Sequence, residues 1–396
     1  MPLPPNSQWN YPTAVRFGIG RIAELSAICK DLGMQRPLFV TDPQVAKLPA
    51  TQECIRALAA AGLAAQSHTD IQPNPVEANV TEGIRVYRAG QCDGVIAFGG
   101  GSALDVGKAV ALMVGQTRPL WDFEDREDWW KRVDPTRMAR VIAVPTTAGT
   151  GSEVGRAAVI TDVRDHVKRI IFHPRMMPAC VILDPALTVG LPPHVTAATG
   201  MDALSHALEA FCAAGFHPMA DGIAVEAMRL IADALPRAYR DGCDLEARAQ
   251  MLVASSMGAT AFQKGLGAMH AMSHPCSALL GSHHGLTNAV VMPYVLAWNE
   301  PVVAERLGRL AAYLSLKHPS FSGVLDWVLE LRGLLGIPGR VDALGVREEH
   351  IEALARQAHV DPSAATNPCQ LSVTDFENLF RCALAGELPN AGAMRG

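Results

Sequence analysis

The first half of the chain alternates between two patterns of hydrophobic and polar positions. Four short apolar or β-branched runs, each bounded by turn residues, are PLFVTD (37–42), GVIAFGGG (94–101), RVIAVPTT (140–147) and ACVILDP (179–185). Between these strand-like runs, apolar residues recur at helical spacing, for example over 22–33 and 76–90. Strands that alternate with helices are typical of a parallel sheet covered on both faces, so we expect a Rossmann-like α/β domain at the N-terminus.

The pattern changes after a proline-rich segment, LDPALTVGLPPHVT (183–196). Strand signals largely disappear beyond it, and one helical pattern follows another to the end of the chain, beginning with TAATGMDALSHALEAFCAA. We therefore predict an all-α C-terminal domain joined to the α/β domain near 185–195. The predicted domains are 1–190 and 191–396.

Two glycine-containing loops are candidates for binding a dinucleotide. GIGRIA (18–23) fits the G-x-G-x-x-A fingerprint, with Asp42 at about the expected distance for a ribose-binding acid, but the strand before it is very short and a plain turn is the better interpretation. GGGSALDVGKA (99–109) follows a buried strand and opens a helix, where glycines and the helix N-terminus favour a phosphate. Ser102 and Asp105 in this loop could equally be an ordinary helix cap.

A second polar turn, PTTAGTGSE (145–153), follows another buried strand. Ligands of open α/β sheets bind at the carboxyl ends of the strands. Taken alone, this turn could be a simple Gly/Thr loop. Two such loops at neighbouring strand ends predict a nucleotide-binding crevice.

The helical half carries a histidine-rich segment, GLGAMHAMSHPCSALLGSHHG, with four of the chain's 13 histidines. Asp202 and His206 lie four apart in a helical pattern, and His270 and His274 repeat that spacing, with His284 further along. Residues at i and i+4 share a helix face, so these side chains can converge on one cation. One Asp with three neutral His ligands suits Fe²⁺ or Zn²⁺.

A single histidine on an apolar helix is more often a core residue than a ligand. Two i, i+4 pairs and a further histidine, in a chain with little local charge, favour a metal site instead. All four histidines of the segment would crowd the ion beside Asp202 and His206. At least one of them therefore has another role.

Composition narrows the function further. The 396 residues are 49% hydrophobic and carry a formal net charge of −5, which argues against nucleic acid or an anionic membrane as the main partner. No apolar run reaches transmembrane length, and the first residues lack the pattern of a secretion signal. Nine cysteines without a CxxC pair fit reduced thiols in a cytoplasm.

In these motifs the chain resembles the iron-containing (group III) alcohol dehydrogenase family. The landmarks, in family order, are PNP (73–75), GGGSALDVGKA, PTTAGTGSE, GMDALSHALEA, GAMHAMSHP and HHGLTNAVVMPYV (283–295). The resemblance covers nearly the whole chain. It implies the architecture that this family shares with dehydroquinate synthase, in which 1–190 binds the dinucleotide and 191–396 is the metal-binding and catalytic domain.

The resemblance implies a role for the residues singled out above. Asp202, His206, His270 and His284 match the family's metal ligands. His274 matches a histidine placed towards substrate and nicotinamide, so it is our candidate for a catalytic proton relay. Fe²⁺ is the expected ion, with Zn²⁺ as the alternative. Phe262 is expected to line the substrate pocket.

Eleven positions match the family's cofactor site: Asp42, Asn74, Gly100, Gly101, Ser102, Asp105, Thr146, Thr147, Thr150, Lys168 and Leu183. A carboxylate at Asp42 repels a 2′-phosphate, so we expect NAD in preference to NADP. In this light GIGRIA is a structural turn.

Two residues depart from the family pattern. His283 stands where the family usually has Pro or a small residue, and a supporting or solvent-facing role is expected for it. Arg156 would suit an anionic group of a substrate, but a surface ion pair explains it equally well. Relatives that reduce maleylacetate lack the full ligand set that this chain keeps, which counts against that activity.

The predicted function is a metal-dependent, NAD(H)-linked oxidoreductase. It would interconvert a small alcohol, or hydroxy acid, and its aldehyde or ketone by hydride transfer in a cleft between the domains, with the metal polarising the substrate oxygen. A homodimer or larger homo-oligomer is expected from the family. The alternatives are a lyase of the dehydroquinate synthase type, which needs a Glu-containing ligand set that this chain fits poorly, and a non-catalytic nucleotide- or metal-binding protein.

Overall fold

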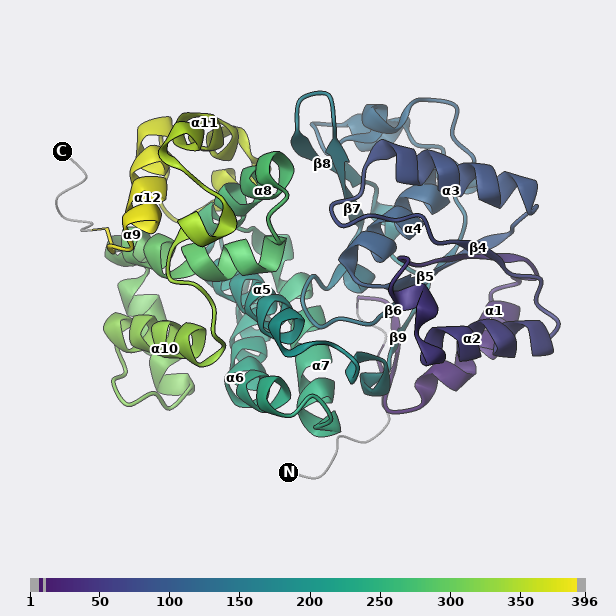
Figure 1. Cartoon of the computed structure of the whole chain (residues 1–396), viewed down its shortest axis with the longest axis horizontal. Helices are drawn as coiled ribbons and strands as arrows, with labels where there is room; N and C mark the ends of the chain where they lie inside the picture. The colour runs from purple at the N-terminus through teal and green to yellow at the C-terminus, as the bar shows by residue number, and fades with distance from the viewer. Residues whose placement is uncertain (1–6, 10–11, 390–396) are drawn as a thin grey trace. The chain divides into compact units, whose positions relative to one another are not determined.

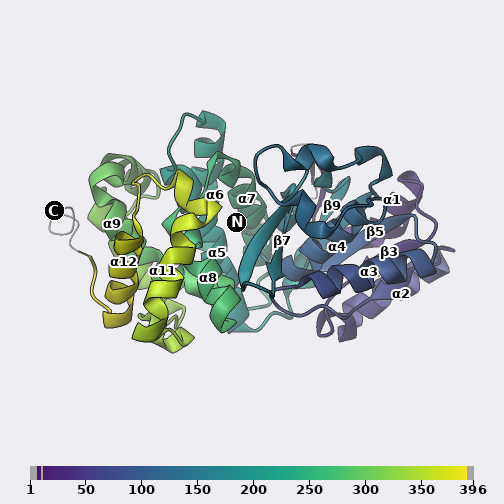
Figure 2. The ribbon, with the colours of Figure 1, turned by 90° about the horizontal axis from the view of Figure 1, so that it is seen from above.

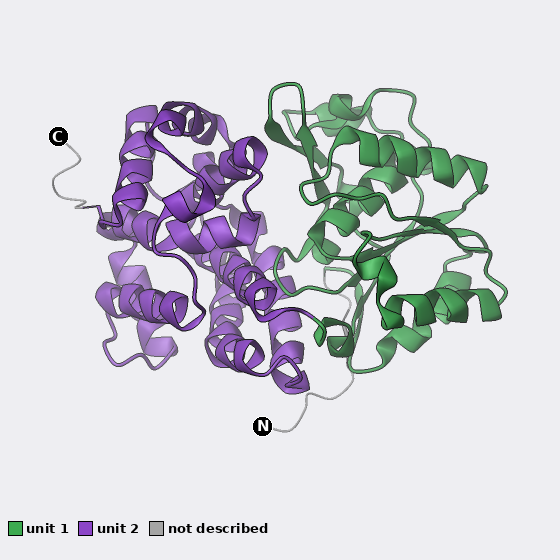
Figure 3. Cartoon of the chain, in the orientation of Figure 1, with its two compact units in different colours: residues 1–190 green, residues 191–396 purple. Residues whose placement is uncertain are grey.

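A central sheet organises the N-terminal part of the chain. In the computed structural model, which describes residues 7–9 and 12–389, contacts divide the chain into two units, 1–190 and 191–396 (Figure 3). The strands of unit 1 that form the main sheet are, in spatial order, β1 (Ser7–Trp9), β2 (Ala14–Phe17), β9 (Cys180–Leu183), β6 (Val141–Pro145), β5 (Gly94–Gly99), β3 (Pro37–Val40) and β4 (Gln66–His68). Only the pairing of β1 with β2 is antiparallel among these described strands.

Helices cover both faces of this sheet. They are α1 (Leu25–Asp31) and α2 (Pro49–Ala60) on one face, and α3 (Glu77–Ala89) and α4 (Gly101–Met113) on the other (Figure 1). Because both faces are covered, β3, β5, β6 and β9 are buried along their whole length. This is why they appear in the sequence as continuous apolar runs.

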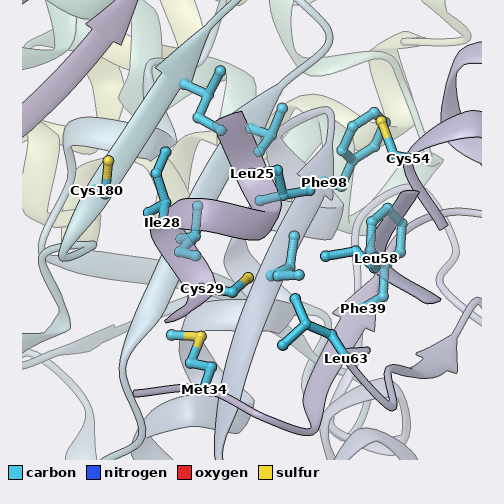
Figure 4. Close-up of a cluster of buried hydrophobic side chains, with 14 residues drawn as sticks. Leu25, Ile28, Cys29, Met34, Phe39, Cys54, Leu58, Leu63, Phe98 and Cys180 are labelled. Carbon is cyan, nitrogen blue, oxygen red and sulfur yellow. The ribbon is translucent and has the colours of Figure 1, made fainter. Parts of the chain in front are cut away.

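The alternation of side chains along β5 shows how the two faces are filled. Ile96 and Phe98 belong to a buried cluster with residues of α1 and α2, and the Phe98 ring lies 5.2 Å from that of Phe39 (Figure 4). Ala97 points to the opposite face, where a Cβ on Gly107 of α4 would lie only 2.6 Å from its own Cβ. Gly107 therefore lets α4 pack closely on the sheet.

A two-stranded hairpin, β7 (Ala157–Asp162) and β8 (Val167–Phe172), forms a separate sheet in unit 1. The sequence pattern did not predict it, because neither strand is buried along its whole length and β8 includes the charged residues Lys168 and Arg169. Asp162 is buried and accepts hydrogen bonds from Arg164 and Arg169, which join the two strands. The side-chain hydrogen bond from Arg164 holds the pKa of Asp162 well below its ordinary value.

Unit 2 is helical, and no strand occurs among its described residues. Its α-helices are α5 (Pro193–Cys212), α6 (Pro218–Arg240), α7 (Leu245–Ala261), α8 (Ala268–Leu280), α9 (His284–Tyr313), α10 (Phe321–Leu334), α11 (Ile351–Val360) and α12 (Val373–Ala385). The fold predicted from the sequence, an α/β unit followed by a helical unit, is confirmed. None of the described helices is long and apolar enough to span a membrane.

Helix α5 is buried on nearly all sides from Thr196 to Phe211. Two glycines of neighbouring helices allow this close packing. A Cβ on Gly285 of α9 would lie 2.5 Å from the carbonyl oxygen of Ala198, and one on Gly258 of α7 would lie 3.1 Å from that of Ala203. The polar side chains on α5 are therefore held inside the unit, away from bulk water.

Candidate functional site

Three of the predicted metal ligands lie together in unit 2. Asp202 and His206 lie one turn apart on α5, and His270 comes from the first turn of α8, which approaches α5 (Figure 2). One ligand atom of each residue lies within 4.8 Å of the other two, and all three residues are buried. Side chains from two helices therefore converge on one point.

His284, the fourth predicted ligand, begins α9 and lies beside this group. Its Nε2 is 3.7 Å from Asp202 Oδ1, and its ring centroid is 5.3 Å from that of His270. Its Nδ1 lies 3.1 Å from the hydroxyl of Ser273. His284 is not one of the three residues whose ligand atoms lie within 4.8 Å of one another, so the structure places it next to the cluster.

Asn288, one turn along α9, shows that these groups face a common point. Its amide nitrogen donates to Asp202 Oδ1 over 2.8 Å, and it lies 3.3 Å from Nε2 of both His270 and His284. A carboxylate only accepts, so the amide must present its NH₂ group there, and the two Nε2 atoms face the same donor. Lone pairs from a carboxylate and two imidazoles thus point to one small region, as a divalent cation requires, and these donors suit Fe²⁺ or Zn²⁺.

A buried glutamate, Glu209, lies behind His270. Its Oε2 is 2.6 Å from His270 Nδ1, and its Oε1 accepts the backbone N–H of Met269 over 2.6 Å. Burial by itself would lower the pKa of His270, but Glu209, with Asp202 and Asp361, outweighs it and raises that pKa. Glu209 was not among the predicted site residues, although its position three residues after His206 was a usable signal.

His274, the predicted proton relay, lies at the edge of the cluster. Its ring stacks on that of His284, with centroids 5.2 Å apart and an interplanar angle of 11°. Its Nδ1 is 2.8 Å from Asp361 Oδ2, while Asp361 Oδ1 accepts the N–H of Ser363. Burial would raise the pKa of Asp361, but the hydrogen bonds and the charge of His274 lower it. Asp361 was also missed, because nothing local in the sequence connects it with His274.

Two further residues of unit 2 have clear positions. The ring of Phe262, in the short 3-10 helix Phe262–Lys264, lies 5.1 Å from that of His206, so an apolar surface stands beside the cluster. His283 is exposed and accepts the N–H of Leu286 through Nδ1, which makes it the N-cap of α9. Its neighbour His284 faces the cluster.

The predicted phosphate-binding loops lie at the carboxyl edge of the main sheet. Val40 pairs in register with Ala97, and Gly99 with Pro145, so the loops after β3, β5 and β6 leave the sheet side by side. The three loops hold the predicted residues Asp42, Gly100, Gly101, Ser102, Thr146, Thr147 and Thr150. The structure therefore brings this part of the predicted cofactor set together.

Two glycines leave room in this loop cluster. Gly100 precedes α4 and Gly101 is its first residue. A Cβ on Gly100 would lie 3.6 Å from Thr147, and one on Gly101 would lie 2.6 Å from Thr150. A side chain at Gly101 would crowd Thr150, so glycine keeps this loop, which is predicted to bind a phosphate, free of bulk.

Asp42 lies against the same loop. Its Oδ1 accepts the N–H groups of Gln44 and Val45, each over 2.9 Å. Its Oδ2 lies 3.5 Å from the position that a Cβ on Gly99 would take, and Gly99 has a φ of 144°, which favours glycine. The carboxylate is thus held at the end of β3 next to the glycines.

The hydroxyl groups at this edge fit a polar ligand. Thr146 and Thr41 each bury a hydroxyl oxygen that has no hydrogen-bond partner in the described part of the chain. A buried hydroxyl without a partner is costly, so a bound group that bonds to it would be stabilising. Ser102 is the second residue of α4, and no side chain caps that helix, so the alternative of a Ser102 cap is not seen.

Asp105 and Lys108 hold the second loop to α4. Asp105 accepts the hydroxyl of Ser152 over 2.5 Å and the N–H of Val159 over 3.0 Å. The fully buried Lys108 donates to the backbone carbonyls of Ser152 and Ala157, and burial lowers the pKa of its ammonium group. Both oxygens of Asp105 bind this chain's own groups, and Lys108 was missed.

The remaining predicted cofactor residues lie in two places. Asn74 has a φ of 53° and precedes Pro75, whose carbonyl accepts the N–H of Thr161, the register partner of Lys168. Both Asn74 and Lys168 therefore belong to the hairpin region. Leu183 is fully buried at the end of β9, and its carbonyl accepts the N–H of Gly18 in the GIGRIA turn.

Arg156 lies just before β7. Its guanidinium carbon is 5.8 Å from the centre of the Phe172 ring. Burial raises the pKa of Asp125, and the positive charge of Arg156 opposes that rise. Arg156 is thus close to both an aromatic ring and a carboxylate of its own unit.

Comparison with known proteins assigns both halves of the chain to one family. The family model "Iron-containing alcohol dehydrogenase" matches residues 12–185, and "Fe-containing alcohol dehydrogenase family, C-terminal" matches 196–384. The chain is 38% identical over 380 residues to 4-hydroxybutyrate dehydrogenase of Cupriavidus necator, covering 93% of this chain and 98% of that one. It is 36% identical over 383 residues to NAD-dependent methanol dehydrogenase of Bacillus methanolicus, covering 94% and 98%.

Solved structures of other oxidoreductases are similar to this chain over nearly its whole length. The structure of a 1,3-propanediol oxidoreductase has a TM-score of 0.89 and 33% identity, covering 93% of this chain and 97% of that one. A sulfoacetaldehyde reductase from Bifidobacterium kashiwanohense, solved in complex with NAD⁺, has a TM-score of 0.85 and 30% identity, covering 96% and 98%.

Proposed function

This chain belongs to the iron-containing alcohol dehydrogenase family, and we propose that it is a metal-dependent, NAD(H)-linked oxidoreductase that interconverts a small alcohol, or hydroxy acid, and its aldehyde or ketone. The family resemblance inferred from the motifs is confirmed. The observation that carries the proposal is the convergence of buried Asp202, His206 and His270. Such a cluster in an apolar unit is costly unless a cation binds it.

The metal centre would use these three residues and His284. We include His284 because its Nε2 and that of His270 face the same amide of Asn288. Fe²⁺ is the proposed ion and Zn²⁺ the alternative, since both accept carboxylate and imidazole. When bound, the ion supplies Lewis-acid polarisation of the substrate oxygen and the dinucleotide supplies the hydride acceptor or donor.

Unit 1 would hold the dinucleotide at the carboxyl edge of its sheet. The backbone at Gly100 and Gly101 and the start of α4 would face the pyrophosphate. Thr146 offers a buried hydroxyl without a partner. The fixed carboxylate of Asp42 favours a free ribose hydroxyl over a phosphate, so NAD is proposed over NADP.

The residues beside the metal cluster have proposed roles of their own. His274 would hold or move the substrate proton at Nε2, since Asp361 engages its Nδ1. Asp361 keeps the ring in that orientation. Phe262 would exclude water on the side of His206.

The lyase alternative is weakened by Glu209. A Glu-containing ligand set was the requirement for an enzyme of the dehydroquinate synthase type. Glu209 contacts the proposed ligand His270, and both of its oxygens bind groups of this chain. Glu209 lies on the Nδ1 side of His270, away from Asn288, and is not in the group of three whose ligand atoms converge.

The proposal extends to the partners, the oligomeric state and the location of the enzyme. Its partners would be small molecules, with neither nucleic acid nor membrane among them, and a homodimer or larger homo-oligomer is proposed. A cytoplasmic location fits the nine cysteines, which are all free.

A substrate panel with elemental analysis tests the proposal. Protein freed of metal by a chelator is reloaded with Fe²⁺ or Zn²⁺ and mixed with short alcohols, hydroxy acids or aldehydes, while NADH absorbance is followed. We expect metal-dependent turnover, and lower activity when NADP(H) replaces NAD(H). Metal-loaded protein that binds NAD normally but turns over no member of the panel would contradict the dehydrogenase and favour a non-catalytic binding protein.

A further inference from the structure

We propose that Glu209 is a positioning residue of the metal centre, which fixes the tautomer and the direction of His270. In this arrangement Glu209 takes the proton-bearing Nδ1 of the ring, so that Nε2 offers its lone pair to the ion. The inference rests on the proposed function in one respect: it requires a metal at Asp202, His206 and His270.

The position of Glu209 on α5 is the first support. It follows Asp202 and His206 along one face of the helix, at i+7 and i+3 respectively, and it is buried. One helix face thus supplies two ligands and the group that contacts the third. The contact between Glu209 of α5 and His270 of α8 is buried, so water does not compete for it.

The hydrogen-bonding logic of the His270 ring is the second support. An ionised carboxylate 2.6 Å from Nδ1 can only accept, so Nδ1 carries the proton and Nε2 is left with its lone pair. On the opposite side, the amide of Asn288 presents donors, because it must donate to Asp202. Both neighbours of the ring therefore select the tautomer that binds a metal.

Carboxylates that accept from the second nitrogen of a metal-binding histidine are a recurrent feature of metalloproteins, because they hold the ring and raise its basicity. A purely structural role for Glu209 is the competing explanation. Its Oε1 accepts the N–H of Met269, one of the otherwise unsatisfied amides at the start of α8. The neighbouring N–H of Ala268 is taken by Asn367.

Glu209→Gln separates the two roles. The glutamine keeps the shape and can still accept from Met269 through its carbonyl oxygen. Its NH₂ group then faces His270 and favours a ring that accepts at Nδ1 and carries its proton on Nε2, where the ion would bind. If the amide turns over, the NH₂ group meets the N–H of Met269 instead, which leaves both donors without an acceptor.

The measurement is the dissociation constant for Zn²⁺ of the chelator-treated full chain, by competition with a chromophoric chelator. We expect Glu209→Gln to weaken Zn²⁺ binding by about 10- to 100-fold while NADH binding is unchanged. A second readout is ¹⁵N NMR of histidine-labelled, metal-free protein at an alkaline pH where the His270 ring is neutral, with the His270 signal assigned from His270→Ala. The proton should move from Nδ1 to Nε2, a change that a structural role would not produce.

A matched control is Glu246→Gln, which alters another buried glutamate of the same unit, whose partners include Arg237. It should lower stability without changing Zn²⁺ affinity. Glu209→Gln with wild-type Zn²⁺ affinity, or with the proton of His270 still on Nδ1, would overturn the inference. Equal loss of Zn²⁺ affinity in Glu246→Gln would overturn it as well, since the effect would then be general.

The proposed function fails differently. A wild-type chain that binds Zn²⁺ but turns over no substrate contradicts the dehydrogenase, while the affinity and tautomer comparisons still decide the role of Glu209. Conversely, an active wild-type enzyme whose Glu209→Gln variant keeps its metal affinity leaves the function intact and removes the inference.

Discussion

The two candidate sites of this protein are built in contrasting ways. The loop cluster in unit 1 consists of backbone and small side chains that follow directly after β3, β5 and β6. The metal cluster in unit 2 consists of polar side chains from α5, α8 and α9, most of them buried. The loop cluster needs small residues at Gly100 and Gly101, where a Cβ would approach neighbouring threonines. The metal cluster needs the side chains that supply its ligand atoms.

The contrast teaches where each site is vulnerable. Added bulk should damage the loops, because Thr147 and Thr150 already lie close to the glycines. Removal of a side chain should damage the metal cluster, because Asp202, His270 and Asn288 contact one another and each loss leaves a buried polar neighbour without its partner. Changes in one unit should therefore leave ligand binding in the other largely intact.

The largest effect is expected from His270→Ala. The variant loses a ligand atom of the group of three and should retain no metal after dialysis, while NADH still binds to unit 1. Elemental analysis and fluorescence titration with NADH measure the two sites separately. A metal content equal to that of the wild type would show that the ligand set is misassigned.

Lys108→Met tests whether the two loops of unit 1 depend on a buried charge. Removing one partner of a buried pair leaves Asp105 and the carbonyls of Ser152 and Ala157 uncompensated, so the free energy of unfolding should fall by about 3 kcal/mol. Urea denaturation followed by tryptophan fluorescence gives the change. Lys131→Met, which breaks an exposed pair with Asp128, should cost less than about 1 kcal/mol. Equal losses in the two variants would argue against the role of Lys108.

Gly101→Ala tests whether NADH binding needs a residue without a side chain at the start of α4. The new Cβ would lie 2.6 Å from Thr150, so we expect NADH binding to weaken by about tenfold, or about 1.4 kcal/mol, with metal content unchanged. Gly190→Ala is the control, since a Cβ there has no atom within 4 Å. Unaltered NADH affinity in Gly101→Ala would mean that the nucleotide does not approach this glycine.

The smallest effect concerns the hairpin that carries Lys168. Asp162→Asn removes a buried carboxylate paired with Arg164 and Arg169, and should lower the free energy of unfolding at pH 7 by about 1 kcal/mol. Because folding lowers the pKa of Asp162, its contribution is present above the unfolded pKa of about 3.9 and is lost as pH falls below it. The difference in free energy of unfolding between wild type and variant, measured by urea denaturation, should therefore become smaller only near pH 4 and below. If this difference disappears between pH 7 and pH 5, a titratable group other than Asp162 causes the loss of stability.

Much of this protein was determined by local sequence. The buried strands, the glycine loops and the Asp202–His206 face of α5 could be predicted, because periodicity and turn chemistry are properties of neighbouring residues. The i, i+4 spacing also brought His270 and His274 forward as candidates. Only one of these two lies in the group of three, since the spacing gives a shared face but not what that face contacts.

The tertiary structure decided the rest. Only the resemblance to the family distinguished His283 from His284 in the sequence. In the structure the start of α9 makes the first an exposed cap and turns the second towards Asp202. Asn288 and Asp361 look like ordinary polar residues of a helix and a turn. Only the packing of α9 on α5, and of the end of α11 on α8, gives them Asp202 and His274 as partners. The physical reason is that a hydrogen bond between distant residues depends on how helices pack, and that packing leaves no periodic trace near either residue.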